Sequence, residues 1–200
     1  MASVAISSKD VSELRGRTGA GMMDCKRALE EAGGDMEKAA EILRKKGIAK
    51  ADKRAGRTAS QGTVVSYIHH NGQVGVLVEL NSETDFVART DTFQQLARDI
   101  ALHVASVDPI GVSAADVPAE LIERERRIAE EQVIAEGKPE AVRTKIVEGK
   151  VKKFIAERTL LEQPYVRDDK KTVGELVKEI SGKTGENIQV RRFTRFQIGE

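Results

Sequence analysis

We predict an α+β fold from three features of the order and spacing of apolar residues along the 200-residue chain. Short helical segments separated by glycines fill the N-terminal part. Two alternating segments, TVVSYIHH and QVGVLVEL, flank Asn71-Gly72 and predict a β-hairpin with a tight type I′ turn. Long helical segments follow, and an alternating segment, NIQVRRFTRFQI, ends the chain. Together these features predict a helical bundle, a linker and a small antiparallel sheet covered by helices.

Three short helices are expected in the N-terminal part. Ser7 or Ser8 caps the first helix, and TGAGMM then supplies the glycines that a tight turn requires. A second helix runs over residues 22–32 and stops at a pair of glycines. Asp35 caps a third helix, which ends before Gly47. Three helices of this length predict a small, UBA-like bundle near the lower limit of size for independent stability.

A basic segment follows the third helix. Residues 44–61 hold seven Lys or Arg side chains against the single acid Asp52, with little apolar periodicity. The segment is interpreted either as a solvated helical linker or as a contact to RNA phosphates; no side chain in it is of a kind that reads bases. We therefore divide the chain into an N-terminal helical domain (1–47), a basic linker (48–61) and an α+β core domain (62–200).

The core domain alternates helices with strands. One helix is predicted by apolar residues at helical spacing, namely Phe93, Leu96, Ala97, Ile100, Ala101 and Val104. Pro118 opens a charged helix that Gly137 stops, and Pro139 begins another. Thr172 and Glu175 form a capping box for a short helix ending at Gly182.

The C-terminal strand is expected to pair with the hairpin. Its residues Ile188, Val190, Thr194, Phe196 and Ile198 lie on one face, with Arg192 interrupting. Helices on one side of a three-stranded sheet leave the second face without a cover. Tyr67 and Phe193 are expected there, which would suit a dimer or partner surface.

The composition excludes several classes of protein. The net charge of +1 argues against binding of polyanions by the chain as a whole, and 4% aromatic residues argue against a base-stacking platform. One cysteine, Cys25, allows neither an internal disulfide nor a multi-cysteine zinc site, and His69, His70 and His103 have no metal-ligand spacing. The N-terminus lacks the regions of a signal peptide, and no apolar window spans a membrane. We expect a cytoplasmic protein without a metal or cofactor.

The motifs of common enzymes are missing from the sequence. No G-x-S-x-G or post-strand G-x-G-x-x-G occurs. The segment GKTGEN (182–187) is not a phosphate-binding loop, because Val177 stands where that motif requires glycine. Three scattered histidines and one cysteine offer little for a nucleophile–base pair, so we expect a binding protein rather than an enzyme.

Two apolar features fit poorly with a purely structural role. Met22 and Met23 are adjacent, and adjacent helical residues point about 100° apart, so at least one is expected at the surface. The alternative is that both fill gaps in the small bundle. Phe86 lies beside Asp85 in a connector between a strand and a helix. It either packs under the following helix as a hydrophobic staple or is displayed to a partner.

These same segments carry a resemblance to a known family. ELRGRTGAGMMDCKRAL (13–29) and TDFVA (84–88) resemble the two signatures of bacterial-type translation elongation factor Ts. The segments GKPEAVRTKIVEGKVKKF (137–154), EQPYV (162–166) and KTVGEL (171–176) are similar to further stretches of that family. The similarity extends over nearly the whole chain.

The resemblance implies a guanine-nucleotide exchange factor for elongation factor Tu, the GTPase that delivers aminoacyl-tRNA. It implies that the N-terminal domain grips the partner's nucleotide domain through Arg15, Met22, Met23 and Lys26. It also implies that the TDFVA loop disturbs the partner's magnesium site. The residues of this exchange loop are Thr84, Asp85, Phe86, Val87 and Ala88.

The chain is similar to the short form of the family. The longer form has two related core subdomains and a coiled-coil insertion, whereas this sequence offers one hairpin and one final strand for a single sheet. We therefore expect a homodimer in which two such sheets replace the paired subdomains, and no direct contact to nucleic acid or membrane. The alternative function is RNA or ribosome binding through residues 44–57, with an affinity that falls steeply with salt.

Overall fold

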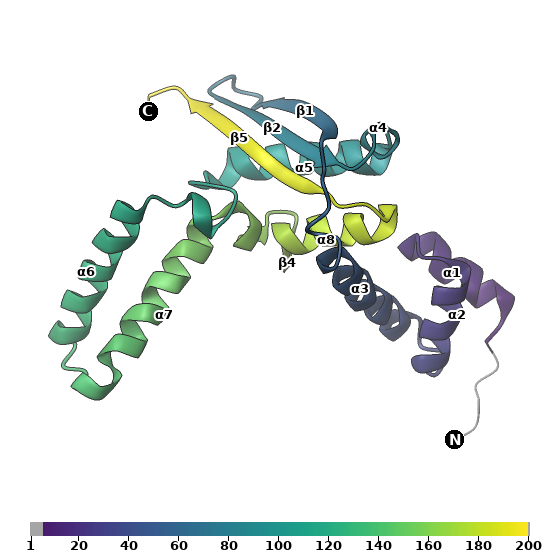
Figure 1. Cartoon of the computed structure of the whole chain (residues 1–200), viewed down its shortest axis with the longest axis horizontal. Coiled ribbons are helices and arrows are strands. Elements are labelled where there is room, and N and C mark those ends of the chain that lie inside the picture. The colour runs from purple at the N-terminus through teal and green to yellow at the C-terminus, as the bar shows by residue number, and fades with distance from the viewer. Residues whose placement is uncertain (1–5, 200) are drawn as a thin grey trace. The chain divides into compact units, whose positions relative to one another are not determined.

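The computed structural model of the protein describes residues 6–199 and confirms the α+β class (Figure 1). The described chain forms two compact units. The head unit comprises the described residues up to 62, with 81–93 and 177–189; the sheet unit comprises 63–80, 94–176 and those from 190 onward. The division into domains at residues 47 and 61 stays a prediction. Residues 1–5, on which part of the signal-peptide expectation rests, lie outside the described residues.

Three helices form the bundle of the head unit: α1 (Ser8–Thr18), α2 (Met22–Glu31) and α3 (Met36–Asp52). Ser7 caps α1 as predicted, because its Oγ accepts the Asp10 backbone N–H at 3.1 Å. Asp35 caps α3 in the same way. The buried side chains of the bundle are Val11, Leu14, Cys25, Ala28, Leu29, Ala39 and Leu43. The predicted number and order of these helices are confirmed.

Two helices run past the glycines that were predicted to end them. The helix α3 continues through Gly47 to Asp52, and α8 (Val173–Thr184) continues through Gly182. The two glycines face each other, and a Cβ added to Gly182 would lie 3.0 Å from the Cα and carbonyl oxygen of Gly47. Close backbone approach of two helices, rather than helix termination, therefore explains glycine at both positions.

The close approach of the helices predicts opposite effects for two alanine substitutions. Gly182→Ala places its methyl group against backbone, so we expect a loss of about 1–3 kcal/mol in the free energy of unfolding from overpacking. A Cβ on Gly47 would lie 4.0 Å from the Gly182 Cα, an ordinary contact. Gly47→Ala is therefore expected to gain about 0.5–1 kcal/mol from helix propensity. Urea unfolding at constant m-value measures both, and equal effects of the two substitutions would contradict the packing account.

A three-stranded sheet in the order β1-β2-β5 provides the framework of the sheet unit. The strands are β1 (Gln61–Ile68), β2 (Val74–Ser82) and β5 (Gln189–Gln197), so the predicted pairing of the last strand with the hairpin is confirmed. The type I′ turn is wrong, because Asp108 is the one non-glycine residue with positive φ among residues 6–199. The Gly72 N–H instead closes a turn onto the His69 carbonyl, and Gly72 itself adopts the left-handed conformation.

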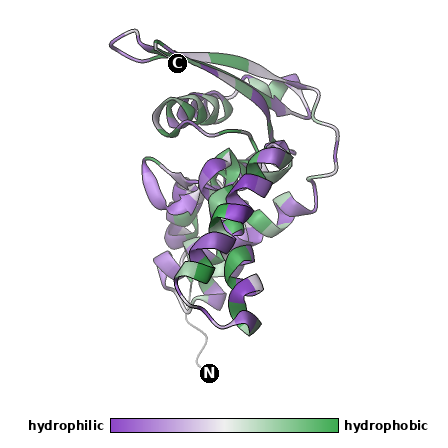
Figure 2. Ribbon diagram, turned by 90° about the vertical axis from the view of Figure 1, so that its left-hand side faces the viewer, coloured by the Kyte–Doolittle hydropathy of each residue, from purple (hydrophilic) through white to green (hydrophobic). Residues whose placement is uncertain are grey.

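One face of the sheet is covered by α5 (Asp91–Val107), as Figures 1 and 2 show. On β2, Val76, Val78 and Leu80 are buried, and α5 buries Leu96, Ala97, Ile100, Ala101 and Val104. These alternating and helically spaced residues form the core that the sequence predicts.

The other face of the sheet carries exposed apolar side chains in the described part of the chain, and we call it the open face. It presents the exposed residues Val64, Ile68, Leu77 and Phe196. Two contacts show which residues of neighbouring strands share this face. Gly75 on β2 lies against Ile68 on β1, and Glu79 on β2 pairs with Arg192 on β5 at 2.7 Å. The expectation of an exposed apolar face was right in kind, but Tyr67 and Phe193 are partly buried and are not its exposed members.

The helices α6 (Ala119–Ala135) and α7 (Glu140–Arg158) pair as an antiparallel hairpin (Figure 1). Its seam buries Ala129, Val133, Val147 and Val151. The two helices predicted to begin at Pro118 and Pro139 are therefore confirmed. The 3₁₀ turns η1 (Ala114–Asp116) and η2 (Leu160–Glu162) flank the hairpin. No helix in the described part of the chain is long and apolar enough to span a bilayer.

His103 joins α5 to the segment around the two-stranded sheet of β3 (Pro164–Tyr165) and β4 (Asp168–Thr172). The His103 Nδ1 accepts the Val166 backbone N–H at 3.3 Å, so the ring proton is on Nε2 and is donated to Gln163 Oε1 at 2.9 Å. Burial lowers the pKa of His103 below its ordinary value, although the Gln163 contact opposes this shift. The folded protein therefore holds this imidazole neutral.

The buried imidazole predicts a loss of stability in mild acid. The unfolded chain binds a proton at His103 as the pH falls below about 6.5, whereas the folded chain does not until lower pH. We expect the free energy of unfolding to fall there by up to about 1.4 kcal/mol per pH unit from this group. Urea unfolding from pH 7.5 to 5 should show a shallower dependence for His103→Gln than for the exposed-site control His70→Gln. Identical profiles would contradict this.

Candidate functional site

The segment 84–88 forms a one-turn helix, α4 (Asp85–Ala88), in the head unit. Thr84 caps it, because its Oγ1 accepts the Val87 backbone N–H at 3.3 Å. Ala88 is buried and anchors the turn, whereas Phe86 is 79% exposed. The staple interpretation of Phe86 is therefore wrong: the ring is displayed at the surface on a short, capped helix.

Asp85, next to that ring, is paired within the loop. Its Oδ2 lies 2.9 Å from Arg89 Nη2, and both side chains are substantially exposed. An exposed ion pair of this kind contributes at most about 1 kcal/mol. The carboxylate is therefore free to exchange Arg89 for another cationic partner at small cost.

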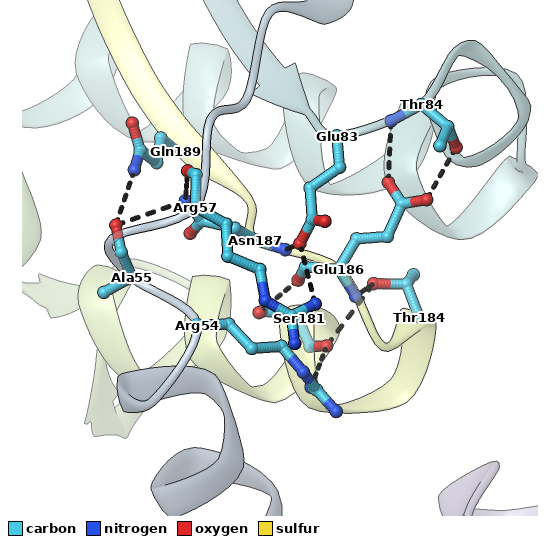
Figure 3. A network of polar contacts seen from close by, with 10 residues as sticks. All are labelled: Arg54, Ala55, Arg57, Glu83, Thr84, Ser181, Thr184, Glu186, Asn187 and Gln189. Carbon is cyan, nitrogen blue, oxygen red and sulfur yellow. Dashed lines mark hydrogen bonds and ion pairs between the residues drawn. The ribbon is translucent and has the colours of Figure 1, made fainter.

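The loop is held from a distant segment of the head unit (Figure 3). The Glu186 carboxylate accepts two hydrogen bonds from Thr84: one from the backbone N–H at 3.0 Å and one from Oγ1 at 2.6 Å. In return, Glu83 Oε1 accepts the Asn187 backbone N–H at 2.6 Å. Two consecutive residues before α4 are thus bound reciprocally to two consecutive residues after α8.

The segment that follows α8 is itself firmly attached. The Asn187 amide donates to the carbonyl oxygens of Ala55 and Arg57, at 3.3 and 2.7 Å, and Ser181 Oγ donates to the Glu186 carbonyl (Figure 3). Four separate stretches of the head unit therefore meet here, and we call them the brace: residues 55–57, 83–84, 181 and 186–187. The exposed loop stands on a polar, hydrogen-bonded base.

Sequence reasoning missed the brace. Glu186 and Asn187 lie in GKTGEN, which we considered only as a phosphate loop, and Thr84 and Glu186 are 102 positions apart. No local periodicity reports a contact at that separation. The one available sign was a carboxylate and an amide side chain directly after Gly185, the residue that follows α8.

The four predicted partner-binding residues of the bundle lie at its surface. Met22 and Met23 open α2 and are 51% and 64% exposed, so neither fills a gap in the core. Arg15 on α1 and Lys26 on α2 are also exposed. Cys25, one residue from this group, is buried, as expected for a small core residue. The bundle therefore exposes flexible thioether side chains together with cations.

Most Lys and Arg side chains of the basic segment contact acidic side chains or backbone carbonyl oxygens within the chain. Five of its cations form ion pairs, namely Arg44–Glu179, Lys45–Glu41, Lys46–Glu31, Lys50–Asp24 and Arg57–Glu83. Arg54 donates to the Ser181 carbonyl. The hydrogen bond from Lys50 lowers the pKa of Asp24, with Arg27 adding to the effect. Much of the positive charge available for phosphates is thus neutralised by the fold.

The fold and these surfaces define an α+β protein with a braced, aromatic-bearing loop and an apolar patch on a helical bundle. Within residues 6–199, no three His, Cys, Asp or Glu side chains are placed to hold a metal ion. The exposed groups are of the kinds that bind proteins.

The chain belongs to the elongation factor Ts family. The family model described as Elongation factor TS matches residues 37–200. Among curated relatives, Elongation factor Ts of Carboxydothermus hydrogenoformans is 58% identical, over 98% of this chain and 90% of the relative. Those of Fervidobacterium nodosum and Thermosipho melanesiensis are 55% and 56% identical, over 98% of this chain and 99% and 100% of the relatives. The resemblance noted in the sequence is confirmed.

Proposed function

We propose that this chain is a guanine-nucleotide exchange factor that binds elongation factor Tu and promotes release of GDP. The observation that carries the proposal is Phe86, 79% exposed on a one-turn helix whose cap is held by the brace. An exposed phenylalanine on a fixed support is suited to insert between elements of a partner. The protein would work without a cofactor and without making or breaking a covalent bond.

The thermodynamics of exchange set what the loop must do. An exchange factor shifts its partner towards the nucleotide-free state only by the difference between its affinities for the two states. Burial of the Phe86 ring in the empty partner alone would supply about 1.5–3 kcal/mol of that difference. Asp85, released from Arg89, would compete for the groups that order the partner's magnesium ion. Because coupling is reciprocal, GTP binding would then expel the exchange factor.

The bundle would provide the grip. Met22 and Met23 offer adaptable apolar contact, while Arg15 and Lys26 add charge that orients the complex. Binding through these residues would occur in both nucleotide states and bring the loop to the nucleotide site. In this arrangement, the bundle residues would set the affinity for elongation factor Tu, and the loop would set the rate of GDP release.

The open face would form a homodimer. Val64, Ile68, Leu77 and Phe196 are apolar and exposed on one side of a sheet whose other side is a core. Two copies packed through this face would bury both apolar surfaces and make a two-layer sandwich. We place the complex in the cytoplasm, where translation factors act.

Release of labelled GDP from purified elongation factor Tu tests the function. The wild-type chain is expected to accelerate release in proportion to its concentration until saturation, at moderate salt and without added cofactor. The RNA-binding alternative predicts no acceleration and an RNA affinity that falls by decades as salt rises. Binding to elongation factor Tu without faster release would refute the exchange function.

A further inference from the structure

The conformation of the loop depends on a carboxylate far along the chain. Thr84 Oγ1 donates its hydrogen to Glu186 Oε1 at 2.6 Å, and the Thr84 N–H points to Glu186 Oε2 at 3.0 Å. Because the hydroxyl hydrogen is directed to the carboxylate, the oxygen's lone pairs are left for the Val87 N–H, 3.3 Å away. One side chain thus orients both the entry of the chain into α4 and the group that caps it (Figure 3).

We propose that Glu186 is a positioning residue for nucleotide exchange. It holds α4 in the orientation that presents Phe86 to the partner, and it acts through Thr84 without touching nucleotide or metal. Glu83 supports the same arrangement from the other side through the Asn187 N–H. This inference rests on the proposed exchange function.

The chemistry of the contact requires a carboxylate. Thr84 offers two donors on adjacent atoms, and a carboxylate supplies two acceptors whose charge strengthens both hydrogen bonds. An amide at the same position has one acceptor atom and no charge, so it can accept from only one of the two Thr84 donors in this paired geometry. Glu186→Gln, which is nearly isosteric, therefore loses or reverses at least one of the two hydrogen bonds and removes the charge from the other, while the surrounding packing is kept.

A pair of substitutions at Thr84 provides an independent route to the same contact. Thr84→Val keeps the shape of the side chain but removes both the donor to Glu186 and the acceptor for Val87. Thr84→Ser keeps the hydroxyl and is the matched control. If the contact positions the loop, valine should reproduce the effect of Glu186→Gln and serine should not.

The primary experiment measures GDP release from elongation factor Tu against the concentration of each full-length variant. Loss of a charge-assisted hydrogen bond predicts a maximal release rate about tenfold lower for Glu186→Gln and Thr84→Val. The half-saturating concentration should stay unchanged, because the bundle residues are untouched. Thr84→Ser, which keeps the donor to Glu186, should release GDP faster than Thr84→Val. Equal maximal rates for all four proteins would overturn the proposal.

A double substitution separates positioning from general destabilisation. If Glu186 acts only through the displayed ring, Glu186→Gln has no further effect once Phe86→Ala is present. A merely structural carboxylate would slow the Phe86→Ala protein by the same factor as the wild type. That multiplicative outcome would overturn the positioning role.

Amide hydrogen exchange in the free protein makes failure of this inference distinguishable from failure of the function. The Thr84 and Val87 amides should lose protection in Glu186→Gln, with core amides of α5 unchanged. Lost protection with a wild-type release rate would overturn positioning and leave the exchange function standing. Wild-type release by Phe86→Ala would overturn the positioning role alone, whereas a wild-type chain that binds without faster release would refute the exchange function itself.

Discussion

Phe86→Ala is expected to slow saturated GDP release from elongation factor Tu by about ten- to a hundredfold relative to the wild-type chain. The estimate follows from the loss of about 1.5–3 kcal/mol of ring burial that is realised only in the nucleotide-free complex. Because the ring is 79% exposed in the free protein, its removal should leave the unfolding curve nearly unchanged. Stopped-flow release with a fluorescent GDP analogue gives the rate.

Two controls make the result specific. Ile134→Ala truncates another exposed apolar side chain, on α6, and should release GDP at the wild-type rate. Phe86→Leu retains most of the apolar area and should fall between wild type and alanine. A Phe86→Ala protein that is folded, binds elongation factor Tu and exchanges normally would show that the ring is not the wedge.

Phe196→Glu is expected to convert the proposed homodimer into a monomer. The substitution places a carboxylate at an apolar position of the open face, and burying it unpaired against a second copy would cost several kcal/mol. The dimer dissociation constant should rise at least about a hundredfold. Sedimentation equilibrium should then report 21.9 kDa for the variant and twice that mass for the wild-type chain at micromolar concentration.

A control for Phe196→Glu introduces a carboxylate at an exposed apolar position outside the open face. Ile134→Glu lies on the helical hairpin and should remain dimeric. Because Phe196 is already 68% exposed, Phe196→Glu should fold as the wild type does, which circular dichroism can verify. A wild-type chain that sediments as a monomer would rule out the open face as a dimer surface at that concentration.

Local sequence signals predicted most elements because their causes are local. Ser7, Asp35 and the Thr172–Glu175 box begin helices through bonds that span only a few residues, and all three caps are present. Alternation and helical spacing likewise identified the sheet and α5. Glycine was misinterpreted where its role is non-local: Gly47 and Gly182 allow two helices to approach, and nothing in their neighbouring residues distinguishes this from a helix end.

The candidate site likewise contains residues that the sequence could identify and residues that it could not. Exposure of Phe86 could not be decided from sequence, because a staple and a displayed ring share one local pattern and only the fold separates them. The residues of the loop itself were named from the family resemblance. Glu186, which supports them, could not be named, since its contact to Thr84 links positions 102 apart and leaves no periodic trace.

The distance in sequence between Thr84 and Glu186 has a consequence for when the loop becomes oriented during synthesis of the chain. The residues of the loop emerge from the ribosome well before Glu186, which follows Thr84 by 102 positions. Until that late segment arrives, Thr84 has no carboxylate to hold it, and the aromatic ring of Phe86 has no fixed direction. A nascent or truncated chain would therefore carry every residue of the loop and still lack the contact that we propose to orient Phe86 for exchange.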